Sequence, residues 1–87
     1  MTVFAILVKT EEPRLAAAIE EHFKDNFLKV GPGQWFVAGS GTSVDVSNTL
    51  GITTGSTSTG IVLSINSYYG RASTNIWEWL KVKLSTP

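Results

Sequence analysis

The chain has 87 residues, 43% of them hydrophobic, with seven Lys and Arg, seven Asp and Glu, one His and no Cys. This length predicts one domain, residues 1–87, whose single core buries about 60–65% of the unfolded surface. Without cysteine, a disulfide framework and a thiolate zinc site are both excluded. The formal net charge is zero, and no strong basic stripe is visible. A nucleic-acid partner, which usually needs many phosphate contacts, is therefore disfavoured and stays only a remote alternative.

The first predicted element is a strand over residues 2–8, TVFAILV. Its continuous apolar, β-branched and aromatic run is typical of a strand that is buried on both faces. The run is too short for a signal-peptide core or a membrane span, and no basic segment precedes it. We therefore expect a cytoplasmic protein that has no membrane partner.

A helix is expected to follow at Glu12-Pro13-Arg14, because proline favours the first turn of a helix. Acidic residues and Lys24 fall on the side that faces water. The opposite, inner face of this helix is predicted to carry Leu15, Ile19, His22, Phe23 and either Asn26 or Phe27.

His22 is the single histidine of the chain, and a metal site needs further histidines or convergent acids. Its predicted place beside Ile19 indicates a partly buried structural histidine. Neither a serine–aspartate pair nor a cysteine accompanies it, so triad chemistry has no support. We assign no catalytic residue, no metal ligand and no cofactor, and we expect the glutamate pairs of the helix to be solvated.

Two strands around a tight turn are predicted next. Residues 27–30, FLKV, and 34–38, QWFVA, flank Gly31-Pro32-Gly33, which is a strong turn signal. These three segments together predict a β-hairpin.

The stretch 39–52, GSGTSVDVSNTLGI, allows two interpretations. Thr42 or Ser43 can cap a helix with Asp45 in its first turn, and Leu50-Gly51-Ile52 is typical of a helix end. However, residues 43–47 alternate between polar and apolar, and valine is a weak helix former, so a second hairpin is the alternative. We favour the helix.

The remaining chain begins with a polar, low-complexity segment, residues 53–60, which we expect to be a flexible loop. A strand over 61–65 and a loop over 67–72 follow. Asn75, with Glu78 three residues later, resembles a capping box for a last helix, IWEWLKVKL. Residues 81–84 alternate as well, so the end of this helix is expected to be either helical or extended.

The order β-α-β-β-α-β followed by a helix predicts an α+β domain of the ferredoxin-like plan with an extra C-terminal helix. In that plan the first strand lies between the third and fourth. The strands are apolar at nearly every position, so the sheet face opposite the first two helices also requires burial. The last helix can cover this face with Ile76, Trp77, Leu80 and Leu84, and a second subunit is the other possible cover. We expect the helix to do so together with a homodimer contact.

The segments GQWFVAGSGTSVDVSNTLGI, GIVLSI and WEW resemble the SinR-like and GhoS-type small antitoxin proteins. These are kin to the small CRISPR-associated ferredoxin-like endoribonucleases. The resemblance implies the fold, a tendency to dimerise and a link to RNA processing. It also implies a metal-binding aspartate at the end of the first strand in the nuclease branch. Val8-Lys9-Thr10 stands there in this chain, so no catalytic residue is carried over.

Two candidate sites follow from the predicted topology. The loop 39–43 lacks the lysine of a P-loop and the third glycine of a dinucleotide fingerprint, which leaves a generic anion site at a helix N-terminus. Because the third and fourth strands would end at one edge of the sheet, the loop 69–73 is predicted to lie near it. The residues of this hypothetical anion or nucleotide site are Ser40, Thr42, Ser43, Tyr69 and Arg71. A plain turn, with Arg71 paired to a surface acid, is the alternative.

The second candidate site is the tryptophan pair Trp77 and Trp79. Two residues that are two positions apart on a helix cannot point in the same direction. One tryptophan is therefore expected to pack on the sheet, and the other to reach an interface, where tryptophan is enriched. The sequence as a whole predicts a non-enzymatic module that associates with itself or with a protein partner. An anion-binding or nucleotide-binding module and an RNA-processing protein are the alternatives.

Overall fold

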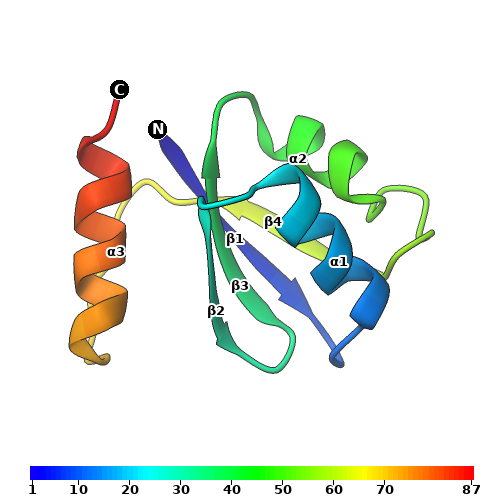
Figure 1. Ribbon diagram of the computed structural model, residues 1–87, viewed down its shortest axis with the longest axis horizontal. Helices are drawn as coiled ribbons and strands as arrows, with labels where there is room; N and C mark the ends of the chain where they lie inside the picture. Colours follow the sequence, from blue (N-terminus) through cyan, green and yellow to red (C-terminus); the bar gives the residue numbers. More distant parts are fainter.

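The computed structural model describes residues 1–87 as an α+β domain with a four-stranded antiparallel sheet and three helices (Figure 1). The strands lie in the order β2-β3-β1-β4, so β1 is between β3 and β4, as the sequence predicted. The elements are β1 (Thr2–Val8), α1 (Pro13–His22), β2 (Phe27–Gly31), β3 (Gln34–Gly39), α2 (Ser43–Leu50), β4 (Gly60–Ser64) and α3 (Thr74–Ser85).

The strands pair in a register that sorts their side chains onto two faces. On β1, Phe4 lies opposite Val37 of β3 and Ser64 of β4. Side chains alternate along a strand, so Phe4 and Ile6 point to one face, and Val3, Ala5 and Leu7 point to the other. The predicted hairpin between β2 and β3 is confirmed, with an irregularity in the pairing between Lys29 and Gly31.

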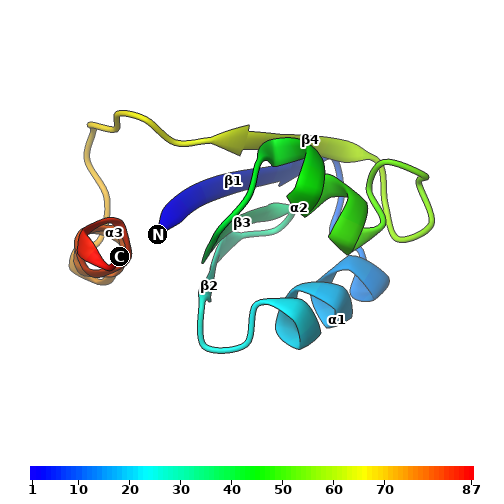
Figure 2. The same ribbon diagram turned by 90° about the horizontal axis from the view of Figure 1, so that it is seen from above.

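Helices α1 and α2 cover one face of the sheet, and α3 lies on the other side of the molecule (Figure 2). The main core fills the space under α1 and α2, where apolar side chains leave water and stabilise the fold. Its buried members are Phe4, Ile6, Leu15, Ile19, Trp35, Val37, Val46, Leu50 and Ile52.

Helix α1 is shorter than its apolar pattern predicted. Glu12 caps it, accepting a hydrogen bond from the Arg14 backbone N–H, and the helix ends at His22. Leu15 and Ile19 face the core. The prediction that His22 is partly buried is wrong, because its side chain is exposed at the last turn. Phe27 does not continue the helical face either: it opens β2.

Helix α2 resolves the ambiguity of residues 43–50 in favour of a helix. Tertiary packing outweighs the alternating pattern, because Val46 and Leu50 are four residues apart and both reach the main core. Gly51 ends the helix in the left-handed conformation at φ 78°, and its N–H reaches the carbonyls of Ser47 and Asn48. The buried Ile52 then folds back onto the core.

Helix α3 begins one residue before the predicted cap. Ser73 is the N-cap and Asn75 lies inside the helix, so the predicted capping box of Asn75 and Glu78 is wrong. The Ser73 hydroxyl donates to Asn75 Oδ1 at 2.6 Å instead of capping the backbone. The helix continues through residues 81–84, whose alternation did not produce an extended tail.

Helix α3 covers only one end of the second sheet face. Leu80 is its single buried residue, and it packs on Val3 of β1 and Ala38 of β3. At the C-terminal end of α3, Lys83 Nζ donates to the Asp25 carbonyl at 3.2 Å, next to the start of β2. The other end of this face stays uncovered within the chain, so the expectation that the last helix covers the face is confirmed at one end only, and the expected homodimer contact stays a prediction.

Candidate interaction site

The loop 39–43 forms the turn from β3 into α2, and Thr42 in it is hydrogen-bonded to Asp45 of the first helical turn. Asp45 Oδ2 accepts a hydrogen bond from the Thr42 N–H at 2.8 Å, and Thr42 Oγ1 accepts one from the Asp45 N–H at 3.2 Å. This is a complete capping box. Gly41 has φ 94°, and a Cβ there would lie 2.8 Å from Asp45 Oδ2, so both its backbone and the cap require glycine.

The capping box weakens the interpretation of the loop 39–43 as an anion site. The Asp45 carboxylate already occupies the helix N-terminus, where a bound phosphate would accept its hydrogen bonds. A second anion would meet that negative charge at short range. The spacing Thr-x-x-Asp over residues 42–45 is the sequence signal for this arrangement. The prediction from sequence gave Asp45 only the role of an acid in the first helical turn.

The structure does not bring Tyr69 and Arg71 to the loop 39–43. Ser40 lines a hollow of about 830 Å³ together with Pro87, so the loop lies near the C-terminal end of α3. Tyr69 and Arg71 precede the other end of α3, which at 1.5 Å per residue is about 18 Å away along its axis. Figure 1 shows the chain crossing to that far end before α3 begins. The five predicted residues therefore do not form one site.

The hollow beside Ser40 is open, and its lining mixes polar and apolar groups. Met1, His22, Lys24 and Asn26 contribute to it, together with the backbone of the loop 39–41. No polar or charged side chain in the chain is buried, so none of these groups is held inside a closed pocket. No group of three or more His, Cys, Asp or Glu side chains gathers where a metal ion could sit.

The two tryptophans of α3 pack in different directions, and both are half-buried. Trp79 stacks on Phe36 of β3 with ring centroids 6.2 Å apart. Trp77 stacks on Tyr68 of the preceding loop at 5.6 Å. Both join the small cluster around Leu80, so neither is a free aromatic side chain. Tyr69, by contrast, is 100% exposed.

One end of the second sheet face is not covered by α3 and exposes apolar side chains. We call this surface the open face. It comprises Leu7 of β1, Val30 of β2, and Ile61 and Leu63 of β4. The exposed fractions of these side chains are 46% for Leu7, 37% for Val30, 62% for Ile61 and 44% for Leu63. Leu7 lies directly opposite Ile61, and Leu63 opposite Ala5, so Leu7, Ile61 and Leu63 form a continuous patch on the adjacent strands β1 and β4.

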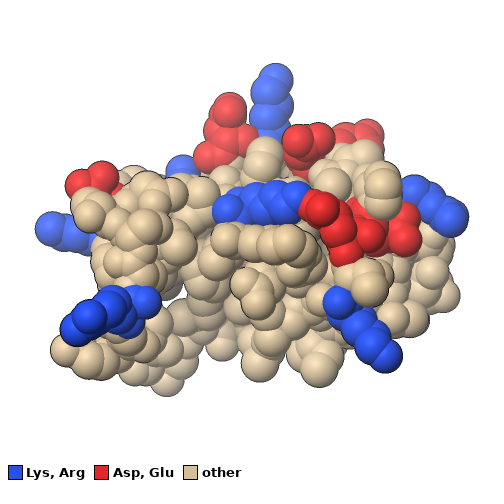
Figure 3. All heavy atoms as spheres, turned by 90° about the horizontal axis from the view of Figure 1, so that it is seen from below, with Lys and Arg blue, Asp and Glu red and all other residues tan.

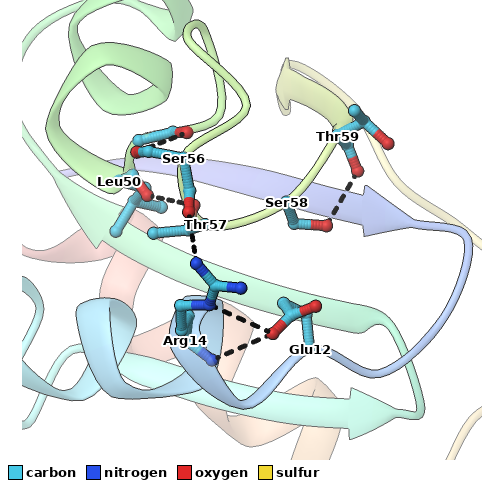
Figure 4. Close-up of polar contacts among 8 residues, drawn as sticks. Glu12, Arg14, Leu50, Ser56, Thr57, Ser58 and Thr59 are labelled. Carbon is cyan, nitrogen blue, oxygen red and sulfur yellow. Dashed lines mark hydrogen bonds and ion pairs between the residues drawn. The ribbon is translucent and has the colours of Figure 1, made fainter.

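The polar loop 53–59, which leads into β4, is tied to the main body by hydrogen bonds (Figure 4). Thr57 Oγ1 donates to the Leu50 carbonyl at 2.6 Å, and Ser56 Oγ donates to the Gly51 carbonyl at 3.3 Å. From α1, Arg14 reaches the Ser56 carbonyl at 3.4 Å. These bonds connect the end of α2, the loop and α1, and the predicted flexibility of the loop stays a prediction.

Comparisons of the chain with protein-family models, with curated proteins and with solved structures find no match.

None of the three helices has the length and apolar character that crossing a membrane requires.

Proposed function

We propose that this protein is a non-enzymatic module that works by self-association through the open face. The observation that carries the proposal is the exposure of Leu7, Ile61 and Leu63 side by side on two adjacent strands. Contiguous exposed apolar side chains are typical of surfaces that bind another protein. Burial of apolar surface contributes about 25 cal/mol per Å² to the free energy of association. A second surface that covers these three side chains therefore gains the most binding free energy at this place.

The distribution of polar groups supports association rather than catalysis. No polar or charged side chain is buried, and the single histidine is exposed at the end of α1. Catalytic groups usually lie in a cleft beside others that tune their reactivity. The hollow beside Ser40 offers no such arrangement, whereas the open face offers apolar area without a partner in the chain.

We further propose that the fold belongs to the ferredoxin-like class and that the protein forms a homodimer. The chain order β-α-β-β-α-β and the place of β1 between β3 and β4 support the class. Self-association is favoured over a foreign partner because the open face and its surroundings on β4 carry no charge that would select one.

The proposal is tested by sedimentation velocity over a wide concentration range. The double variant Leu7→Ser, Leu63→Ser is expected to weaken self-association at least tenfold, because it removes apolar area from the open face. The matched control is Val82→Ser, which removes an exposed apolar side chain of α3, away from that face. Equal association constants for the wild type, the double variant and the control would refute this function.

A further inference from the structure

The outer edge of β4 is an unpaired strand edge. β4 is the last strand of the sheet, and Figure 2 shows no element of the chain outside it. The Ile65 N–H donates to the Val3 carbonyl at 2.8 Å, and these two residues stand directly opposite in the register. In an antiparallel pair the hydrogen-bonded positions alternate, so Leu63 and Ile61 also point their backbone groups towards β1. The backbone groups of Gly60, Val62 and Ser64 therefore point outward.

This edge lacks the features that keep sheet edges apart. Natural edges carry a lysine, a proline or a bulge, or they are covered by another element. β4 has the sequence GIVLS and pairs with β1 in unbroken register. The whole stretch 46–70, which contains β4, has no Asp, Glu, Lys, Arg or His. A broad area in the lower middle of Figure 3 is likewise free of charged side chains.

From these observations we infer that the partner of β4 is β4 of a second copy, in antiparallel pairing. This inference rests on the proposed self-association and places its centre at the β4 edge of the open face, where Ile61 and Leu63 lie. The two open faces then lie side by side in one sheet, and Leu7 and Val30 stay outside the pairing. A twofold axis beside Val62 places Val62 opposite Val62 of the second copy, and Gly60 opposite Ser64. Each of these pairs exchanges both N–H···O=C bonds, and the two sheets join into one.

The lack of charge favours a second copy over a different partner. A twofold axis brings identical residues together, so a charged group near it would face its own like charge, which is destabilising. β4 brings no such group to the axis. The axis also reverses chain direction, so the Asp45 carboxylates at the two α2 N-termini lie at opposite ends of the interface.

The same pairing accounts for the exposed side chains on both faces of β4. On the open face, Ile61 of one copy lies opposite Leu63 of the other, at the close, non-hydrogen-bonded positions. On the opposite face, a groove of about 380 Å³ runs between α2 and β4 and includes Ser47, Thr53 and Val62. Val44, 65% exposed, also lines this groove, beside the edge at which the second copy would pair.

The test uses Ser64, whose N–H points outward and whose side chain is exposed. Proline is tolerated at an edge where the missing N–H faced away from the sheet, so Ser64→Pro removes an intermolecular donor and leaves the β1 pairing intact. Sedimentation velocity is expected to show an association constant at least tenfold weaker than that of the wild type. Ser64→Thr, which keeps the N–H, is the matched control and is expected to dimerise normally.

A second measurement on the wild type does not depend on any substitution. Amide hydrogen exchange at Val62 and Ser64 is expected to slow as the protein concentration rises, while exposed amides of the loop 53–59 stay unchanged. Concentration-dependent protection together with the Ser64→Pro loss supports the inference. A dimer that survives Ser64→Pro and leaves both amides unprotected overturns it, and the proposed function then stands through the open face alone. A monomer up to about 1 mM overturns both.

Discussion

β2 and β4 form the two edges of the sheet and each have five residues, yet they differ in the features that hinder pairing with a further strand. β2 has Lys29 at its centre, and this side chain pairs with Glu11 and lies 5.4 Å from the Trp35 ring centroid. Its pairing is irregular beyond Lys29, and α3 bonds to Asp25 just before it. β4 has neither a charge nor an irregularity, and nothing covers its outer edge.

The difference shows that apolar content alone does not decide which edge is available. β2 is also apolar at Phe27, Leu28 and Val30. A charged side chain, an irregular ladder and a flanking helix each hinder the approach of another strand. All three occur at β2, so the molecule has one protected edge and one open edge, and the proposed association through the open edge would end at a dimer.

The largest effect on stability is expected for the docking of α3, which lies beside β2. Leu80→Ala removes the only buried side chain of α3 and is expected to weaken its docking by about 2–5 kcal/mol. Amide exchange in α3 should then accelerate while the main core keeps its protection. Val82→Ala, at an exposed position of the same helix, should change stability by less than about 0.5 kcal/mol. Equal acceleration of exchange in α3 and the core would show instead that they unfold as one unit.

Removing the charge from β2 is expected to make its edge available for pairing, as the edge of β4 is. Lys29→Val removes the Glu11 pair and leaves a strand without a charged side chain. With two open edges, association no longer closes, and light scattering should show assemblies larger than the wild-type oligomer. Lys81→Val, on the exposed side of α3, removes the same charge away from both edges and should keep the wild-type size. An unchanged size for Lys29→Val would mean that the irregular ladder and α3 protect β2 without the lysine.

A smaller effect on stability is expected at α2, the helix next to β4. Thr42→Ala removes the side chain that caps α2 and is expected to lower the free energy of unfolding by about 1 kcal/mol. Thr49→Ala, exposed inside the same helix, is expected to have the opposite sign because alanine has the higher helix propensity. Urea unfolding measures both. A loss of stability in Thr49→Ala as large as in Thr42→Ala would argue against a specific capping role.

The smallest effect is expected at the loop that leads into β4. Arg14→Ala removes one exposed pair with Glu12, at 3.9 Å, and one long bond to Ser56. Exposed ion pairs contribute little, so the free energy of unfolding should stay within about 0.5 kcal/mol of the wild type. Amide exchange in the loop 53–59 should rise slightly in the same variant. A loss well above 1 kcal/mol would show that Arg14 holds the loop, and thus the start of β4, in place.

Local sequence signals were sufficient for most of the elements. The apolar run at residues 2–8, the turn Gly31-Pro32-Gly33 and the ending at Gly51 each depend on residues that are neighbours in the chain. They therefore predicted β1, the hairpin and the end of α2. The errors also have local causes: His22 shares the helical spacing of Ile19 but falls at the last turn, where no second element covers it.

The sequence by itself determined the order of the elements, the absence of charge from residues 46–70 and the need to bury a second sheet face. These depend on residue types and on short-range periodicity. Only the tertiary structure decided that α3 covers one end of that face, that Tyr69 and Arg71 lie far from Ser40, and which backbone groups of β4 are free. Such features depend on where a loop leads and on strand register, which long-range packing sets rather than any local pattern.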